Sequence, residues 1–269
     1  MVRQVNSVTV TDHRAAPPAG ALRGAVRLTG VSKVFGRGSS AVRALDRVSL
    51  EVPPGEFTCL IGASGCGKST LLSLVAGLEQ PTSGEVSTGG AKVAFMFQEP
   101  ALFPWLTAAG NVELALRARG LGKAERRQRT GELLDTVHLT GFGGKRPHQL
   151  SGGMRQRVAL ARALAQDADV LLMDEPFGAL DAMTRDVLHD ELDRICGGRA
   201  LTVLFVTHNV REAVRLGDRV VVLSSRPGRV IAEFDVPIER PRRIDSAPVA
   251  ELAARVTDRL REEMSRDAS

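Results

Sequence analysis

Several residue types are scarce or missing in this chain of 269 residues. It has no Tyr, one Trp and nine Phe, so it offers few of the aromatic side chains on which proteins stack single-stranded bases. Its three Cys are an odd number without metal-ligand spacing, which indicates a reducing compartment rather than a disulfide framework. We therefore do not expect an aromatic-rich binder of carbohydrate or single-stranded nucleic acid.

Long hydrophobic runs are also missing. No apolar stretch approaches the ~20 residues of a membrane-spanning helix, and the N-terminus lacks the apolar segment of a secretory signal. Residues 1–25 mix Pro, Ala and polar residues without periodicity, which predicts a flexible leader. If the protein serves a membrane, we expect it to dock on a partner.

Charges of both signs are present, but neither sign is concentrated. The net charge is +5 and the isoelectric point about 9.6, yet 36 Lys and Arg are interleaved with 31 Asp and Glu. Most of the cations are Arg, as a genomic composition bias would produce. Because the cations gather on no single segment, we predict no nucleic-acid partner. The positive charge would still favour an anionic membrane surface.

The apolar pattern predicts an α/β fold in residues 26–240. Residues 26–61 contain three strand-like segments with turns between them. Further strands are expected at 93–98, 169–174, 200–208 and 219–225. Helices are expected at 68–78, 105–137 and 152–165, and between the later strands. Such alternation is typical of a parallel sheet covered on both faces.

The C-terminal segment, residues 241–269, has the pattern of an amphipathic helix. Its apolar residues recur at spacings of three and four, at Val249, Leu252, Val256, Leu260 and Met264. The pattern allows this face to pack either on the rest of the chain or on a partner.

One glycine-rich segment carries the clearest chemistry. Residues 62–70 (GASGCGKST) satisfy G-x-x-x-x-G-K-[ST]; they follow the apolar strand FTCLI and open the helix STLLSLVAGL. Glycines let successive N–H groups point at a phosphate, and the helix start adds its unpaired amides. The alternative, a glycine-rich turn before an ordinary helix, does not require this context. We therefore predict a phosphate-binding loop.

Within this loop the chemistry is divided among several residues. Lys68 is expected to bridge the β- and γ-phosphates of ATP, and the Ser69 hydroxyl to hold Mg²⁺. Cys66 is a small filler, and a bulky adduct on its thiol would block the nucleotide. The predicted nucleotide contacts are Gly62, Ser64, Gly65, Cys66, Gly67, Lys68, Ser69 and Thr70.

Two buried strands end in polar residues that suit the same site. VLLMDE (170–175) ends in Asp174, which is placed to hold Mg²⁺, and Glu175, which is placed to polarise the attacking water. VLFVTH places His208 at the end of another buried strand. Ligands in open parallel sheets bind at the carboxyl ends of strands. We therefore predict a γ-phosphate contact for His208 rather than a structural role.

A second glycine-containing helix start carries a family resemblance. Residues 150–156 (LSGGMRQ) resemble the signature motif of ABC ATPases, with Met154 at the variable position. Ser151 and two glycines before a helix form another set of free amides for an anion. In that family the motif completes the ATP site of the opposite subunit, so the resemblance implies a head-to-tail dimer, expected to be a homodimer. The contacts implied across it are Ser151, Gly152, Gly153 and Gln156.

Further segments match this family in the same order, and the resemblance covers residues 26–230. Gln98 resembles the Q-loop residue that touches Mg²⁺ or the water, and His208 resembles the switch histidine. Residues 179–181 (ALD) resemble the D-loop, which implies a contact for Asp181. Phe35 lies where an aromatic residue stacks on adenine, although it would also suit the core.

The resemblance implies a P-loop NTPase fold with a mixed, mainly parallel central sheet, an antiparallel β subdomain and a helical subdomain at about 100–165. It also implies ATP hydrolysis with ATP and Mg²⁺ bound. The expected catalytic residues are Glu175, His208, Lys68 and Gln98, and the expected metal ligands are Ser69, Gln98 and Asp174.

Finer similarity points to the nitrate, sulfonate, taurine and bicarbonate group of ABC importers. Residues 101–120, 175–185 and 206–230 are similar to that group, with Asn209 where Asp is common. The resemblance implies an ATPase subunit at the cytoplasmic face of the cell membrane. Its implied partners are transmembrane permease subunits and, through them, a periplasmic or lipid-anchored substrate-binding protein.

Several alternatives stay open. Phe103, Pro104 and Trp105 are candidates for the permease contact, or Trp105 is core of the helical subdomain. A soluble ABC ATPase of DNA repair or maintenance shares the motifs, but such proteins generally carry coiled-coil or zinc insertions that are missing here. An intact catalytic set argues against a nucleotide-dead module. By family likeness the cargo is an aliphatic sulfonate or taurine, then nitrate, with a thiamine-precursor pyrimidine as the outside alternative.

Overall fold

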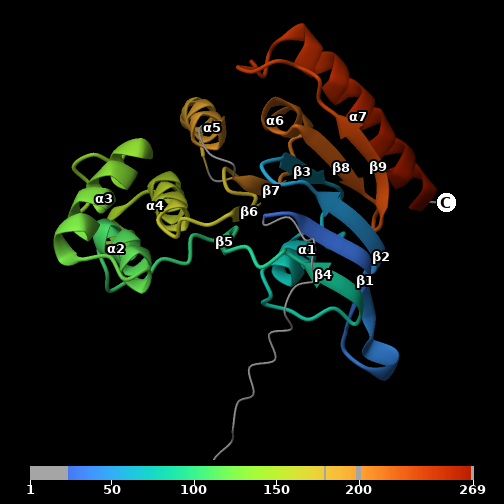
Figure 1. The fold of residues 1–269 in the computed structure, drawn as a ribbon. Helices are drawn as coiled ribbons and strands as arrows, with labels where there is room; N and C mark the ends of the chain where they lie inside the picture. Colours follow the sequence, from blue (N-terminus) through green and yellow to red (C-terminus); the bar gives the residue numbers. More distant parts are fainter. Residues whose placement is uncertain (1–23, 179, 198–200, 268–269) are drawn as a thin grey trace, which may run out of the picture.

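The computed structural model describes residues 24–178, 180–197 and 201–267. Its elements form two β-sheets with helices between and around them (Figure 1). Apart from Gly24 and Ala25, the expected leader lies outside the described residues. None of the described helices is long and apolar enough to cross a lipid bilayer.

The central sheet has six strands in the order β5-β6-β7-β3-β8-β9. The first five run parallel, and β9 closes the edge antiparallel to β8. The strands are β3 (Phe57–Ile61), β5 (Val93–Met96), β6 (Val170–Asp174), β7 (Thr202–Val206), β8 (Arg219–Leu223) and β9 (Val230–Asp235).

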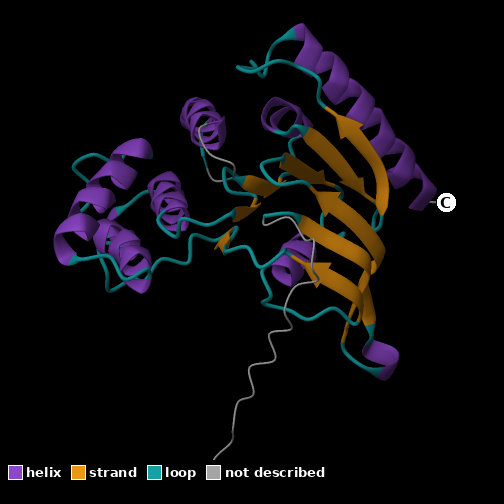
Figure 2. Cartoon of the chain, viewed as in Figure 1, coloured by secondary structure: helices purple, strands orange, loops and turns teal. Residues whose placement is uncertain are grey.

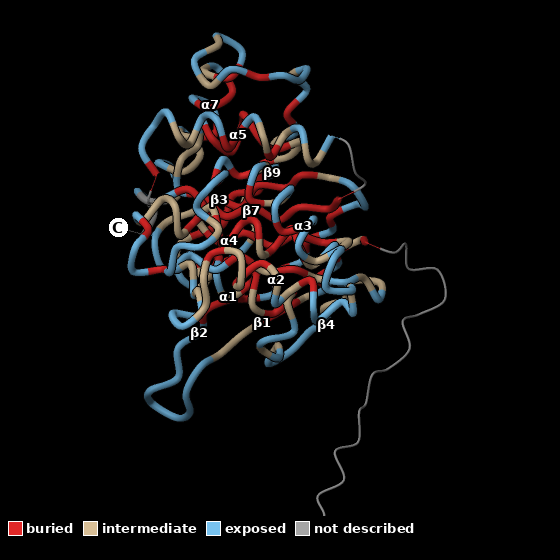
Figure 3. Tube along the Cα trace, turned by 90° about the vertical axis from the view of Figure 1, so that its left-hand side faces the viewer, coloured by how far each residue is buried: buried red, intermediate tan, exposed pale blue. Residues whose placement is uncertain are grey.

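Both faces of this sheet are buried, as the apolar strands predict. Along β6, Val170 and Leu172 pack into the cluster that contains α1, whereas Leu171 and Met173 pack into the cluster on the opposite face. Figure 3 shows the resulting band of buried residues through the middle of the molecule. The sheet is therefore a rigid base for the polar residues that follow its strands.

A three-stranded antiparallel sheet with the order β2-β1-β4 lies across α1 from the central sheet (Figure 2). Its strands are β1 (Val26–Phe35), β2 (Val42–Val52) and β4 (Ser83–Ser87), with a 3-10 turn η1 (Gly38–Ser40) before β2. Helix α1 (Lys68–Val75) contacts strands of both sheets. It ends before the predicted Leu78 because Gly77 has φ +70° and the N–H of Leu78 turns back to the Ser73 carbonyl oxygen at 2.9 Å.

Residues 108–164 form a separate group of helices, α2 (Ala108–Ala118), α3 (Lys123–Thr136) and α4 (Gly152–Leu164), with a 3-10 turn η2 (Pro147–Gln149) before α4. The helical pattern expected over 105–137 is divided between two helices, α2 and α3. Thr107 caps the start of α2 by accepting from the N–H of Gly110 at 3.0 Å. The chain then breaks between α2 and α3, because Gly120 takes the left-handed conformation with φ +85°.

Three helices complete the chain: α5 (Ala182–Gly197), α6 (Val210–Leu216) and α7 (Ala247–Asp267). Helix α7 packs its buried residues Val249, Leu252 and Val256 on α6 and the neighbouring sheet edge. Of the two packing partners that the sequence allowed, the described contacts of α7 are with its own chain. The side chain of Met264 lies outside the description.

Candidate functional site

The loop of residues 62–67 joins β3 to α1, and its glycines stand where other residues would clash. Gly67 has φ +102°, and a Cβ there would meet Cδ2 of Leu45 at 2.7 Å and the carbonyl oxygen of Ala44 at 2.8 Å. Gly65 is also left-handed, with φ +75°. Glycine tolerates this conformation without steric cost, so the chain can turn tightly into the N-terminus of α1.

Lys68 is the first residue of α1, and its side chain turns back over the loop. It is 7% exposed, and its ammonium group donates to the carbonyl oxygens of Gly62 and Ala63, each at 2.9 Å. The Sγ atom of Cys66 lies 3.7 Å from the same ammonium group. Cys66 as a whole is 1% exposed, and its N–H is hydrogen-bonded to the carbonyl oxygen of Ala63 at 3.3 Å, so this residue packs beneath the loop.

Asp174 lies at the carboxyl end of β6, directly beside the loop. It is 7% exposed. Burial raises the pKa of its carboxyl group; a hydrogen bond with the Ser69 hydroxyl and the charge of Lys68 lower it, and the charge of Glu175 raises it further. Because burial disfavours the ionised form of this carboxylate, a cation bound beside it would strongly stabilise that form.

Glu175 meets two other predicted catalytic residues. Its Oε2 atom lies 3.2 Å from Nδ1 of His208 and 3.4 Å from Nε2 of Gln98. Its own backbone is left-handed, with φ +45°, and is held by a hydrogen bond from its N–H to the carbonyl oxygen of Val206 at 3.0 Å. Strained backbone of this kind is found where a side chain must be aimed. Three strands, β5, β6 and β7, thus deliver their following residues to one point.

Most of the predicted residues of the loop line one open pocket of 390 Å³, a size that suits a small-molecule ligand. Phe35 lies at this pocket and is 40% exposed, so it is not core. The Lys33 ammonium group lies 4.9 Å from the centroid of its ring. The lining residues that the sequence predicted are Phe35, Ser64, Gly65, Gly67, Lys68, Ser69, Thr70, Gln98 and Glu175.

Arg226 also lines this pocket, although no sequence motif marks it as a site residue. It lies in the turn between β8 and β9, and its Nε donates to the carbonyl oxygen of Gly65 at 3.2 Å. Val42 and Ala44 of β2 complete the lining. The residues SRPG mark a turn after a strand, but no local signal places this guanidinium group on a loop 161 residues earlier.

The predicted contacts at 151–153 lie elsewhere. The hydroxyl of Ser151 caps α4 by accepting from the N–H of Met154 at 3.2 Å. Ser151 is exposed, and Gly152 and Gly153 are half-buried. None of these three residues is among those that line the 390 Å³ pocket. Of the two helix starts that the sequence predicts to bind an anion, the described structure brings only that of α1 to this pocket.

Gln156 requires a correction. Its side chain is 2% exposed, and its Nε2 donates to the backbone carbonyl of Gln98 at 3.0 Å. Six residues further along α4, Arg162 donates to the carbonyl oxygens of Pro100 and Ala101 at 2.9 and 2.8 Å. The side chain of Gln156 therefore ties α4 to the segment after β5 instead of facing outward towards a second nucleotide.

Asp181 caps the start of α5. Its carboxylate accepts from the N–H and the hydroxyl of Thr184 at 2.9 and 2.7 Å. These hydrogen bonds, led by the one from the Thr184 backbone, lower the pKa of Asp181. Asp181 is exposed and is not among the residues lining the pocket. Ala179, the first residue of the expected D-loop, lies outside the description.

An aromatic pair stands at the surface next to the segment that follows Gln98. Phe103 and Trp105 have ring centroids 5.4 Å apart and are 36% and 67% exposed. Trp105 is therefore not core of the helical region. The buried side chain of Asn111 holds this turn by hydrogen bonds with the backbone of Phe103 at 2.8 and 3.3 Å and of Thr107 at 2.9 Å.

ATP and Mg²⁺ suit the donors that are assembled here. The glycine loop leaves room that a Cβ would fill, and Lys68 supplies a cation in a largely desolvated place. Mg²⁺ prefers oxygen ligands and is usually held by one or two carboxylates beside substrate phosphates. Asp174 and the Ser69 hydroxyl, already hydrogen-bonded to each other, provide such oxygens.

Comparison with known proteins places these residues in a family. Residues 45–178 match the family model described as ABC transporter. An aliphatic sulfonates import ATP-binding protein of Mesorhizobium japonicum is 46% identical over 243 residues, covering 88% of this chain and 89% of the relative. A nitrate import ATP-binding protein of Synechocystis is 44% identical over 218 residues, covering 78% and 82%.

The fold agrees with a solved structure. A dimeric ATP-binding cassette in a post-hydrolysis state, bound to ADP and phosphate, superposes with a TM-score of 0.74 and is 36% identical. The match covers 80% of this chain and 100% of that one. From the matched motifs, the mixed and antiparallel sheets and these relatives, the chain belongs to the ABC transporter family of ATPases.

Proposed function

We propose that this chain is the ATP-hydrolysing subunit of an importer for a small anion and that it works as a head-to-tail homodimer. The observation that carries the proposal is the convergence of Lys68, Ser69 and Glu175 on one pocket, while a second anion-binding helix start, at Ser151, lies outside it. A second copy of the chain would bring its own Ser151, Gly152 and Gly153 over the nucleotide. The dimeric cassette described above supports this arrangement.

The proposed roles follow from the chemistry of each group. Lys68 donates to the phosphates, and Ser69 and Asp174 hold Mg²⁺, which neutralises phosphate charge when it is bound. Phe35 offers its exposed ring to the base. The carboxylate of Glu175 accepts a proton from the attacking water. Gln98 and His208, both hydrogen-bonded to Glu175, orient that carboxylate and contact the γ-phosphate.

Coupling to transport would use the bonds between α4 and the segment after β5. Gln156 and Arg162 fix residues 98–101 to α4, so a change at Gln98 is passed to the helical region as a rigid movement. The exposed pair Phe103 and Trp105 is our candidate for the permease contact, because aromatic side chains are favoured as interface anchors. This contact would hold the subunit at the cytoplasmic face of the membrane, with a substrate-binding protein on the other side.

The cargo proposal is an aliphatic sulfonate, taurine or nitrate. It rests on the names of relatives that are 44% to 46% identical, since no residue of this chain would touch the cargo. An ATPase of DNA maintenance is disfavoured, because the described chain has short connections where such proteins carry long insertions.

The test replaces the native gene with Glu175→Gln in the host and supplies an alkanesulfonate or taurine as sole sulfur source, or nitrate as sole nitrogen source. Sulfate and ammonium are the control nutrients, and Glu251→Gln, an exposed change on α7, is the control variant. Failure of the Glu175→Gln strain only on the sulfonates supports the proposal in full. Failure only on nitrate keeps the importer and fixes the cargo. Normal growth on every medium would contradict import of these anions.

A further inference from the structure

A cluster of buried polar side chains lies directly beneath His208. It joins α5, the end of β7 and α6 through Thr207, His189, Glu212 and Arg215, which are between 0% and 5% exposed. His189 lies 2.8 Å from Oε1 of Glu212 and 2.9 Å from Nη1 of Arg215. The other oxygen of Glu212 is bonded to the hydroxyl of Thr207. Neither the sequence motifs nor the proposed reaction assigns these residues a role.

Two groups that can only donate, the guanidinium of Arg215 and the N–H of Asn209, fix the directions of the hydrogen bonds in the cluster. An Arg guanidinium group only donates, so Nδ1 of His189 accepts and carries no proton. The ring is then neutral, with its proton on Nε2, which donates to Oε1 of Glu212. The hydroxyl of Thr207 accepts from the N–H of Asn209 at 3.0 Å and so donates its own proton to Oε2 of Glu212. The cluster is thus an ordered chain with one arrangement of protons.

This ordered chain holds the segment that carries His208 on both sides. Before it, Thr207 is fixed by its hydroxyl to Glu212 and by its N–H to the carbonyl oxygen of Leu60 at 3.3 Å. After it, the side chain of Asn209 caps α6 by accepting from the N–H groups of Arg211 and Glu212 at 3.1 and 3.2 Å. The side chain of His208 itself is 70% exposed, so its direction depends on these flanking residues.

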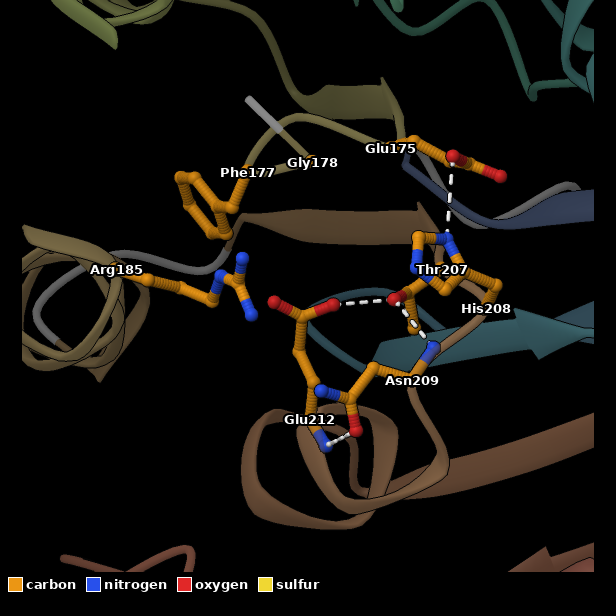
Figure 4. Close-up of a pocket in the computed structure, with 8 residues that line it drawn as sticks. All are labelled: Glu175, Phe177, Gly178, Arg185, Thr207, His208, Asn209 and Glu212. Carbon is orange, nitrogen blue, oxygen red and sulfur yellow. Dashed lines mark hydrogen bonds and ion pairs between the residues drawn. The ribbon is translucent and has the colours of Figure 1, made fainter. Parts of the chain in front are cut away.

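Figure 4 shows how the two parts meet. The ring of His208 points towards Glu175, while Glu212 rises from α6 between Thr207 and Arg185. All of these residues line one small cavity of 20 Å³. Residues of the buried cluster and the Glu175–His208 pair therefore line the same cavity. A displacement of Thr207 would move the adjacent His208 relative to Glu175.

We propose that Thr207 and Glu212 are positioning residues for ATP hydrolysis, acting through His208, with His189 and Arg215 fixing the carboxylate of Glu212. Buried polar networks of this kind rigidify the side chains that they join. This inference rests on the role given to His208 in the proposed function. It predicts that the network sets the turnover rate and leaves nucleotide affinity almost unchanged.

The test measures phosphate release, MgATP affinity and thermal unfolding with the full chain. Thr207→Val keeps the shape and removes the hydroxyl, and we expect kcat to fall about 10- to 100-fold with KM within about twofold, because small misplacements at a reacting centre are costly. Thr207→Ser restores the hydroxyl and should restore kcat to within about threefold.

A matched control lies at the other end of the same strand. Thr202 is equally buried, and its hydroxyl bonds to Gly24 and Gly55, far along β7 from the catalytic pair. Thr202→Val should lower the thermal stability and leave kcat near the wild-type value. If Thr202→Val and Thr207→Val lower kcat equally, the effect is one of general stability and the inference is overturned.

A double-mutant cycle separates this inference from the proposed function. If Thr207 acts through His208, then Thr207→Val should cost less than about twofold in a His208→Ala background, since the two changes are not independent. A fully additive loss would overturn the inference. If His208→Ala alone keeps wild-type turnover, the proposed role of His208 fails and the positioning role fails with it. If His208→Ala loses turnover and Thr207→Val does not, only the positioning role fails.

Should Thr207→Val not fold, Glu212→Gln replaces it in the same cycle. The amide keeps the size of the carboxylate but cannot accept at both oxygens, so one of the bonds to Thr207 and His189 is lost. The same reduction in kcat, absent in the His208→Ala background, supports the inference, and wild-type kcat contradicts it.

Discussion

The two helix starts that the sequence predicts to bind an anion, those of α1 and α4, differ in their surroundings. Helix α1 starts at a left-handed Gly67, with Lys68 buried and with Gln98 and Glu175, which follow β5 and β6, in the same pocket. Helix α4 starts at Ser151, capped by its own hydroxyl and exposed on the helical region. The first has the lysine and the acids of a phosphate site around it. The second offers amides alone, and in the proposed dimer the rest of its site would come from another copy of the chain.

Lys68→Ala tests the first helix start and should have the largest effect. It removes the buried cation from the loop, and we expect phosphate release to fall by about 10³-fold, as for loss of a preorganised charge in an active site. Nucleotide binding should be largely lost, measured by fluorescence titration with a nucleotide analogue. Lys123→Ala, an exposed change on α3, is the control. Unchanged nucleotide affinity in Lys68→Ala would contradict the assignment.

Asp174→Asn tests the metal ligand separately from the residues that contact the nucleotide. We expect Mg²⁺-dependent phosphate release to fall about 10²-fold.

The same variant also tests the effect of burying Asp174. Burial raises the pKa of Asp174, so ionised Asp174 destabilises the nucleotide-free fold at a pH above that raised value. The Asn variant should therefore unfold at higher temperature than wild type at neutral pH. The difference should shrink as the pH falls towards the ordinary Asp pKa of about 3.9, where wild-type Asp174 is protonated. A difference independent of pH would contradict this reading.

Ser151→Ala tests the second helix start. Loss of the cap should lower the free energy of unfolding by about 1 kcal/mol. Because the N–H groups of α4 then lose their ordered arrangement, phosphate release should fall about tenfold. Binding of nucleotide to the single chain should not change, since Ser151 does not line that pocket. Weaker binding to the monomer would show that the two helix starts are not separate.

Arg226→Ala should give the smallest effect. Its guanidinium group bonds to the carbonyl oxygen of Gly65 at the pocket, and an exposed contact of this kind contributes about 1 kcal/mol or less. We expect nucleotide affinity to weaken about threefold. Arg229→Ala is the matched control, because Arg229 pairs with Asp46 instead of the loop. Equal effects of the two changes would remove Arg226 from the site.

The parallel core and the phosphate loop could be predicted because their signals are local. Each of these signals lies within a short stretch of sequence. One is a buried apolar strand that ends in Asp174 and Glu175, and the other is a buried apolar strand followed by a glycine loop and Lys68. Strands β4 and β9 were missed because both lie partly exposed at sheet edges. Strand β4 (SGEVS) has only one apolar residue, and in β9 (VIAEFD) no residue is fully buried. The break between α2 and α3 was missed because one left-handed glycine outweighed the helical pattern on both sides.

The supporting contacts of the site could not be predicted from the sequence. Gln156 lies 58 residues from Gln98, and Arg226 lies 161 residues from Gly65. Which side chain faces which strand depends on the packed fold, and no periodicity encodes it. The role of Gln156 was wrong for this reason, since the motif marks the start of α4 but does not tell which side of the helix is buried.

The most direct test of the account mixes two inactive variants. Lys68→Ala lacks the cation of the loop but keeps the start of α4; Ser151→Arg blocks the start of α4 but keeps the loop. In a head-to-tail dimer, each mixed pair contains one intact site, so an equal mixture should recover up to about one quarter of the wild-type sites and release phosphate accordingly. Each variant alone should release almost none. A mixture no more active than the two variants measured separately would contradict a site shared between two copies of this chain.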